Sequence, residues 1–481
     1  MAVLVGTLFA LSLPCSAAAP VLTTLYNFPG YAPPPFTPCT LPVVVDCVPD
    51  GEFPEAGLVF NAAGALFGTT FSGGVDYGHG TVYELEPPVA PSTTWTPVQI
   101  YAFTGGADGA NPQAGLIFSS RGVLFGTTEY GGAYGYGTVF SLTPGAGGIW
   151  TFAVVYSFAG APAGCGTTGN PACDGENPAA GLILGSVSGY LYGTTANGGT
   201  ANYGTVFELV PTKGGIWTES VLYSFAGAPD GANPVTSLTM NPNGTLYGTT
   251  YDGGVSGTAG GGAAGFGTVF ELTQSKGVFT YKQLYSFNGA PSAADGGIAC
   301  TTTSVPPCDG GFPWGNLVLN TTTGVLTGTT SLGGDPTGCP VGGYTQGCGT
   351  IFQLTPPVAP STTWTETLLY TFGPKQNALL PSFNLVGTGT GTGPFYGTTF
   401  TGASTSLDCF EATTGCGMVF VLRPPVAPST TWTFNTLAVF NSDNGGGPTG
   451  VIMGPTAGTL YGATYDGGLS GGYGTVFQVT F

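Results

Sequence analysis

A recurring acidic motif is the first feature of the sequence that could do chemistry. In each copy an aspartate is followed directly by glycine and, four residues on, by proline: Asp50, Asp108, Asp174, Asp230 and Asp309. A ring of such carboxylates could bind Ca²⁺, which takes oxygen ligands, or the hydroxyls of a sugar. The same letters also describe a turn in which aspartate bonds to the backbone and glycine takes a positive φ. We favour the turn as the local role and keep the five aspartates as candidate ligand-binding residues.

The nucleophilic mechanisms lack their usual partners in this chain. His79 is the only histidine, and it replaces the tyrosine that the second repeat carries at Tyr136. A structural role is the commoner reason for such a replacement, so Ser-His-Asp and Cys-His mechanisms are set aside. Two carboxylates could still cleave a glycosidic bond, but sequence alone does not place two acids at a working separation. The catalytic residues therefore stay unknown, and no cofactor or metal is predicted beyond the calcium option.

Trp314 is the tryptophan that we expect to face a ligand. The other five recur at the start of one repeated segment, which is typical of packing between repeats: Trp95, Trp150, Trp217, Trp364 and Trp432. Trp314 stands outside this series, in an enlarged fifth repeat.

Ten of the eleven cysteines lie in close pairs, which predicts local disulfides. The pairs are Cys39 and Cys47, Cys165 and Cys173, Cys300 and Cys308, Cys339 and Cys348, and Cys409 and Cys416. Short stapled loops of this kind are typical of exported chains, and each bond contributes about 2–3 kcal/mol of stability. A zinc site would need C-x2-C spacing or a histidine partner, and the pairs have neither.

These residues are carried by seven copies of one unit. The copies are marked by "GTT", or "GAT" in the last one, beginning at Gly68, Gly126, Gly193, Gly248, Gly328, Gly397 and Gly462. The sequence of each unit predicts four short strands, because runs of Val, Thr, Tyr and Phe alternate with turn residues. In the second copy these strands cover 114–118, 123–128, 137–142 and 150–158, and we term them a, b, c and d. Four antiparallel strands repeated seven times predict an all-β, seven-bladed β-propeller. A β-solenoid is the alternative, but its coils are shorter.

The two ends of the chain predict how the ring closes. The seventh unit, 448–481, has strands a to c but no strand d, whereas the chain begins with an orphan strand d at 21–28. Pairing the first strand with the last blade would remove two exposed sheet edges. We therefore expect residues 20–481 to form a single seven-bladed domain.

Three stretches carry a family resemblance: "LYSFAGAPDGANP", "GTLYGTTYDGG" and "GTVFELT". They resemble the Gloeo_Verruco (GloVer) extracellular tandem-repeat family of bacterial secreted proteins. The resemblance extends over nearly the whole mature chain and implies export and a tandem β-repeat. It implies no activity and no functional residues.

The composition of the chain limits the classes of molecule that it can bind. The chain has 24 acidic residues against six basic ones, for a formal net charge of −18. Nucleic-acid binding needs clustered Lys and Arg, so nucleic acid is excluded as a partner. Residues 1–19 are apolar and end in small residues, which predicts a secretory signal peptide. No other stretch is apolar for long enough to span a bilayer. We expect a monomer at the cell surface or outside the cell.

Strand direction sorts the loops onto two faces. The d-to-a and b-to-c connections emerge together, and this face carries all five predicted disulfides and the longest insertions. Long loops on a rigid ring are the usual recognition surface of a propeller. Our leading hypothesis is a non-catalytic binding or cell-envelope interaction module for carbohydrate or an extracellular protein. The alternatives are a carboxylate-dependent glycosidase or polysaccharide lyase, with or without calcium, and a purely structural surface protein.

Overall fold

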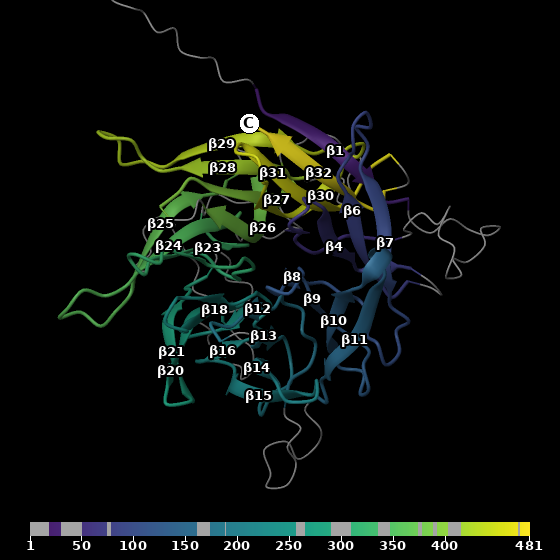
Figure 1. Cartoon of the computed structure of the whole chain (residues 1–481). Coiled ribbons are helices and arrows are strands. Elements are labelled where there is room, and N and C mark those ends of the chain that lie inside the picture. Colours follow the sequence, from purple (N-terminus) through teal and green to yellow (C-terminus); the bar gives the residue numbers. More distant parts are fainter. Residues whose placement is uncertain are drawn as a thin grey trace, which may run out of the picture.

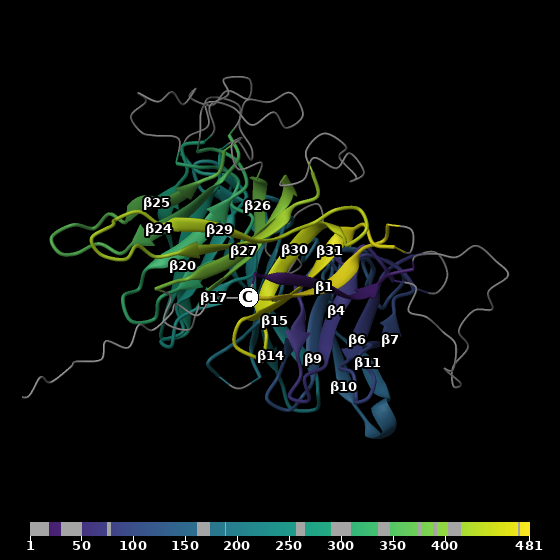
Figure 2. The same ribbon diagram turned by 90° about the horizontal axis from the view of Figure 1, so that it is seen from above.

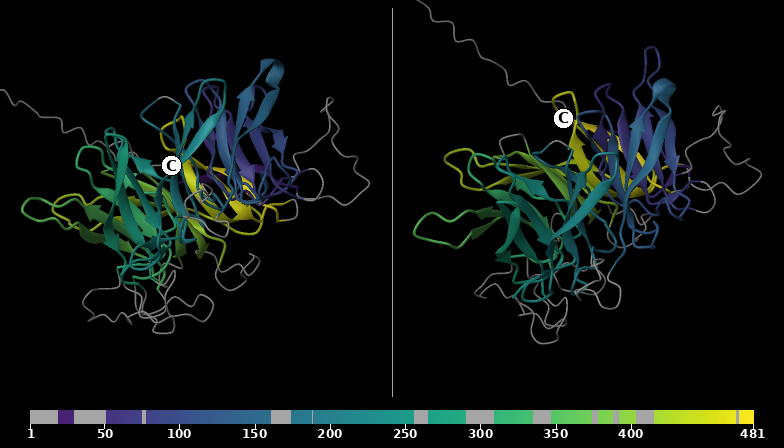
Figure 3. Two further views of the ribbon diagram at one scale, coloured as in Figure 1. Left: turned by 90° about the horizontal axis from the view of Figure 1, so that it is seen from below. Right: turned by 60° about the horizontal axis from the view of Figure 1, so that its bottom comes forward.

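Seven four-stranded sheets form a ring in the computed structural model (Figure 1). The structure describes residues 19–29, 51–74, 78–160, 174–187, 189–255, 265–289, 309–334, 347–373, 378–387, 392–402, 415–469 and 472–481. The colours follow one another around the ring in Figure 1 and in the tilted view of Figure 3. This arrangement confirms the all-β, seven-bladed prediction. Among the described residues no helix has the length and apolar character needed to cross a membrane.

Every blade is an antiparallel sheet whose strands are ordered a, b, c, d from the centre outward. The first three blades contain β3 (Val59–Phe60), β4 (Leu66–Thr70), β6 (Thr81–Glu86) and β7 (Thr96–Ala102); β8 (Ile117–Phe118), β9 (Leu124–Thr128), β10 (Thr138–Pro144) and β11 (Trp150–Ser157); and β12 (Ile183–Leu184), β13 (Leu191–Thr195), β14 (Thr205–Pro211) and β15 (Trp217–Ser224). The next two contain β17 (Thr239–Met240), β18 (Leu246–Thr250), β20 (Thr268–Ser275) and β21 (Val278–Ser286); and β22 (Val318–Leu319), β23 (Leu326–Thr330), β24 (Thr350–Thr355) and β25 (Thr365–Thr371). The sixth contains β26 (Ala378–Gly387), β27 (Phe395–Gly402), β28 (Met418–Arg423) and β29 (Thr433–Val439), and the seventh β30 (Gly446–Met453), β31 (Thr459–Asp466), β32 (Thr475–Thr480) and β1 (Val21–Asn27).

Five short elements lie outside the four-stranded sheets. Two strand pairs, β2 (Gly51–Glu52) with β5 (Ser72–Gly73) and β16 (Gly231–Ala232) with β19 (Asp252–Gly253), join the start of a unit to the end of its strand b. A single 3₁₀ turn, η1 (Ala146–Gly148), forms the hairpin between β10 and β11.

The "GTT" motif has a packing role in strand b. A Cβ atom on Gly126 would lie 2.5 Å from the ring of Phe140 in strand c, so only glycine leaves room for that ring. The hydroxyl of the second threonine, Thr128, bonds to that of Thr138 at 2.8 Å. The first, Thr127, donates to the carbonyl of Ala180 in the next blade. The motif thus fixes both the sheet and its contact with a neighbour.

Seven hydrophobic clusters, one between each pair of neighbouring blades, form the core. The last residue of each "LYSF"-type run contributes a phenylalanine that is at most 1% exposed: Phe28, Phe103, Phe158, Phe225, Phe287, Phe372 and Phe440. The tryptophans that begin strand d pack into the same clusters, as predicted. Trp150, for example, meets Phe67 of the previous blade edge to face, with ring centroids 5.6 Å apart.

The chain ends close the ring. Strand β1 pairs antiparallel with β32, with Val21 opposite Thr480 and Thr24 opposite Phe477. Figures 1 and 2 show the purple first strand beside the yellow last blade. Phe28 then packs with Tyr83 of the first blade, at a centroid distance of 5.1 Å. The predicted closure is confirmed.

Strand a is shorter than predicted in the first five blades. In the second blade only Ile117 and Phe118 pair with strand b, although the sequence predicts a strand from residue 114. The preceding residues leave their own sheet because they lie against the neighbouring blade, where the Thr69 hydroxyl donates to the Ala114 carbonyl. This departure frees the segment to line the centre of the ring.

The hairpins between strands c and d point away from the centre. In Figure 2 the hairpins that follow β24 and β28 extend beyond the rest of the ring. Three hairpins share the sequence "PPVAPSTTWT", and each exposes one valine: Val89, Val358 and Val426.

Candidate functional site

A cavity of about 890 Å³ lies at the centre of the ring, and every blade contributes to its lining. Most of its lining comes from the residues that precede or begin strand a and from those that end strand b. These are the points where the d-to-a loops end and the b-to-c loops begin. The cavity therefore belongs to the side of the ring that the sequence predicts to be functional.

Three rings of equivalent positions form this lining, and their side chains differ from blade to blade. The position after the motif proline carries Glu55, Gln113, Ala179, Val235, Trp314 and Thr449. The position two residues farther along the chain carries Gly57, Gly115, Gly181, Ser237, Asn316 and Asn384. The position after the strand-b motif carries Glu129, Ala196, Tyr251, Ser331, Phe400 and Tyr465. The blades thus keep the repeated residues, whereas many positions around the centre differ from blade to blade.

Two of the carboxyl groups that line this cavity, Glu55 and Glu129, influence each other. Burial and the nearby charge of Glu129 raise the pKa of Glu55 to about 7. Burial also raises the pKa of Glu129, although a hydrogen bond from Tyr130 opposes the shift. The amide of Gln113 donates to Oε2 of Glu129 at 2.6 Å and fixes its orientation. At neutral pH Glu55 is therefore protonated about half of the time.

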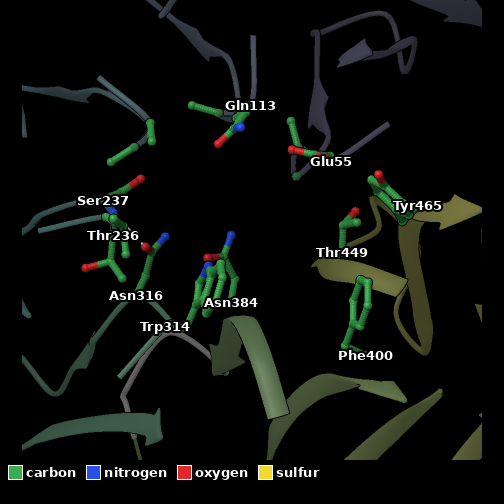
Figure 4. A pocket seen from close by; sticks show the side chains of 18 of the residues that line it. Glu55, Gln113, Thr236, Ser237, Trp314, Asn316, Asn384, Phe400, Thr449 and Tyr465 are labelled. Carbon is green, nitrogen blue, oxygen red and sulfur yellow. Dashed lines mark hydrogen bonds between the residues drawn. The ribbon is translucent and has the colours of Figure 1, made fainter. Parts of the chain in front are cut away.

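Amides and aromatic rings complete the walls, as Figure 4 shows. Oδ1 of Asn316 accepts a hydrogen bond from the backbone N–H of Ser237 at 2.9 Å, which fixes that amide between two blades. Tyr465 stacks on Phe53 with centroids 4.9 Å apart. Trp314 meets Tyr251 edge to face at 5.2 Å. In Figure 4 Glu55 and Gln113 lie across the open centre from Asn316 and Asn384.

The chemistry of these walls suits a polyhydroxylated molecule. Carboxylates and amides offer paired donors and acceptors at fixed positions, and aromatic faces provide flat apolar contact. Narrow glycine positions allow the blades to approach: a Cβ on Gly115 would lie 3.3 Å from the carbonyl oxygen of Gly57.

The structure places four of the five motif aspartates in loop hydrogen bonds. The Asp174 carboxylate accepts from the Tyr156 hydroxyl at 2.6 Å and from the backbone N–H of Ala159 and Gly160. Asp108 and Asp230 likewise accept from a strand-d tyrosine and a nearby backbone N–H.

Asp309 repeats this pattern with Tyr285 and Asn288. None of these four aspartates is among the residues that line the cavity, and Asp50 lies outside the described residues. Ligand binding by the five aspartates stays a prediction.

The other candidates fall into two groups. Trp314 is in the cavity lining, and its contact with a ligand stays a prediction. His79 lies apart from the cavity, with its ring against Gly105. Cys348 and Cys416 are buried and disulfide-bonded, and the other eight paired cysteines lie outside the described residues. The five predicted pairings therefore stay predictions.

Sequence reasoning missed the acids and amides of the cavity. Glu55, Gln113, Glu129 and Asn316 occupy repeat positions at which the residue varies among the blades. Such variation beside strongly repeated letters is a signal that could have located them.

One family model, described as the Gloeobacter/Verrucomicrobia repeat, matches residues 39–258 and 170–407 of the chain. No curated protein matches the chain significantly.

Three solved structures are similar in outline. The polysaccharide lyase Uly1 is 12% identical with a TM-score of 0.46, covering 89% of this chain and 90% of its own. Sqt1 from Chaetomium thermophilum is 13% identical with a TM-score of 0.44, covering 89% and 96%. The Hadza microbial sialidase Hz136 is 13% identical with a TM-score of 0.39, covering 76% and 64%.

Proposed function

The chain belongs to the Gloeobacter/Verrucomicrobia repeat family, and from this premise we propose that it is a secreted propeller that binds carbohydrate in its central cavity. The observation that carries the proposal is the lining of that cavity. Carboxyl, amide and aromatic side chains line it together, and they occur at positions where the residue varies among the repeats. A purely structural propeller has no need of such variation, because identical small residues would close the ring equally well.

Substitution of one aromatic residue and one amide residue of the cavity tests the proposal. Trp314→Ala and Gln113→Ala should each weaken saccharide binding by about tenfold or more, because an aromatic stacking face or a fixed amide is lost. Alanine is tolerated at this position, since the third blade carries Ala179 there. Tyr134→Ala serves as the control, because Tyr134 is exposed and does not line the cavity.

The measurement is affinity on a glycan array, followed by calorimetry with each hit. Binding that is unchanged in both cavity variants would place the ligand elsewhere. The absence of any saturable ligand would favour the structural role.

A second function, cleavage of a glycosidic bond, is favoured by one observation. Glu55 and Glu129 share the cavity, and the raised pKa of Glu55 suits a general acid at neutral pH. Release of reducing ends from a bound polysaccharide would establish turnover, and Glu55→Gln should abolish it. The same assay with and without a chelator tests whether the cleavage requires calcium. Binding without such release supports the non-catalytic role.

A further inference from the structure

We infer that the saccharide of the central cavity carries a positive charge, as an amino sugar does. This inference rests on the proposed function and concerns the class of ligand at the same site. It is based on the charges, the aromatic walls and the amides that surround the opening.

The charges in the cavity have one sign. Glu55, Glu129 and Asp466 line it, and none of its described lining residues is lysine, arginine or histidine. Within the described part of the chain, the ion pair that does form joins Lys282 to Glu271 on the surface of the fourth blade. Among the described residues, Glu55 and Glu129 therefore have no basic side chain as a counter-ion in the cavity.

This arrangement opposes ionisation in the absence of a ligand. Burial and mutual repulsion raise the pKa of Glu55 to about 7, and burial raises that of Glu129. An ammonium group between the two carboxylates would remove the repulsion and replace some of the lost hydration. A cationic ligand should therefore stabilise the ionised carboxyl groups of the cavity more than a neutral ligand does.

The aromatic residues favour the same charge. Tyr465, Phe400, Tyr251 and Trp314 line the cavity, and their faces attract cations by the cation–π interaction. Tyr465 stacks on Phe53. Burial raises the pKa of Tyr465, and the nearby charge of Glu55 raises it further. An aromatic ring and a carboxylate therefore occur together at this wall.

The amides point to a sugar as the carrier of the charge. Gln113, Asn316 and Asn384 surround the centre in Figure 4 and offer donors and acceptors suited to hydroxyl groups. A lysine side chain of a protein would use the carboxylates but would leave these amides without a counterpart.

The test compares oligosaccharides of glucosamine with oligosaccharides of N-acetylglucosamine of equal length, by calorimetry near neutral pH. We expect the amino form to bind about tenfold tighter or more, because its bond to a carboxylate is charge-assisted. Equal affinity for the two forms would overturn this inference and leave the proposed function standing. Binding of neither would also overturn this inference, whereas the proposed function fails only if the glycan array yields no saturable ligand. A lysine oligopeptide that binds as tightly as the amino sugar would overturn the assignment of the charge to a saccharide.

Matched variants locate the charge. Glu55→Gln and Glu129→Gln keep the shape of each side chain, and each should reduce the preference for the amino form. Glu86→Gln, at an exposed hairpin position, should leave it unchanged. Thermal unfolding of each variant confirms that the ring is intact.

Proton release provides a second readout. Binding of a cation should ionise Glu55, so wild-type binding should release protons, detected as a dependence of the binding heat on the buffer. Glu55→Gln should lose most of this dependence. Buffer-independent heat in the wild type would contradict a cation beside Glu55.

Discussion

Buried carboxyl groups between blades set the pH dependence at the scale of single residues. Burial, with a smaller contribution from the charge of Asp174, raises the pKa of Glu219 to about 8. Glu366 has a pKa of about 8 for the same reasons, with Asp309 as its neighbour. Both glutamates are therefore protonated in the folded state at neutral pH, while the unfolded chain ionises them near its ordinary pKa of 4.5.

The sign of the effect on stability follows from this proton balance. Because the folded state binds more protons, the free energy of unfolding should fall as pH rises from about 5 to about 8, by up to about 1.4 kcal/mol per pH unit and group. Glu219→Gln should flatten this slope, since glutamine does not titrate. Denaturant titrations at several pH values would measure it. A variant as pH-sensitive as the wild type would show that Glu219 is not the group responsible.

Strands b and c test the packing argument at the scale of elements. Gly126→Ala should destabilise the protein by about 1–3 kcal/mol, because the added methyl group would overlap the ring of Phe140. Phe140→Leu makes room for the methyl group, so the double variant should lose less stability than the sum of the two single variants. Additive losses, measured by denaturant unfolding, would contradict the contact between strands b and c as its cause.

The same elements show why sequence predicted the blades but not the site. Strands b and c were predictable because packing imposes the same glycine, threonines and phenylalanine in nearly every copy. The lining of the cavity follows no such rule. Glu55 and Glu129 belong to different units, and they share one cavity only because the ring brings the start of strand a and the end of strand b of every blade to its centre. The aspartate motif was conspicuous because its hydrogen bonds to tyrosine recur in loop after loop.

Closure by the two ends of the chain is a property of the whole molecule. Phe28 fills the interface between the last and first blades as Phe225 fills one in the middle of the ring. Phe28→Ala should therefore cost about 3–5 kcal/mol, as much as Phe225→Ala. Comparison of the two unfolding free energies is the measurement. A much smaller cost for Phe28→Ala would indicate that the ring does not depend on its first strand.

The ring also separates the residues that hold the blades together from those that line the cavity. Equivalent interfaces hold the seven blades together, while the residues that line the centre vary among the blades. The fold thus supplies a rigid frame, and the axial positions supply acids, amides and aromatic rings. We expect ligand recognition to change with substitutions at those positions and to be insensitive to changes in the outer hairpins.

A crystal structure of the protein soaked with a glucosamine oligosaccharide would decide where the ligand binds. We predict density for a sugar in the central cavity, with its ammonium group beside Glu55 and Glu129 and one ring against Trp314 or Tyr465. Density for the sugar elsewhere on the molecule, with the cavity unoccupied, would contradict the proposed site.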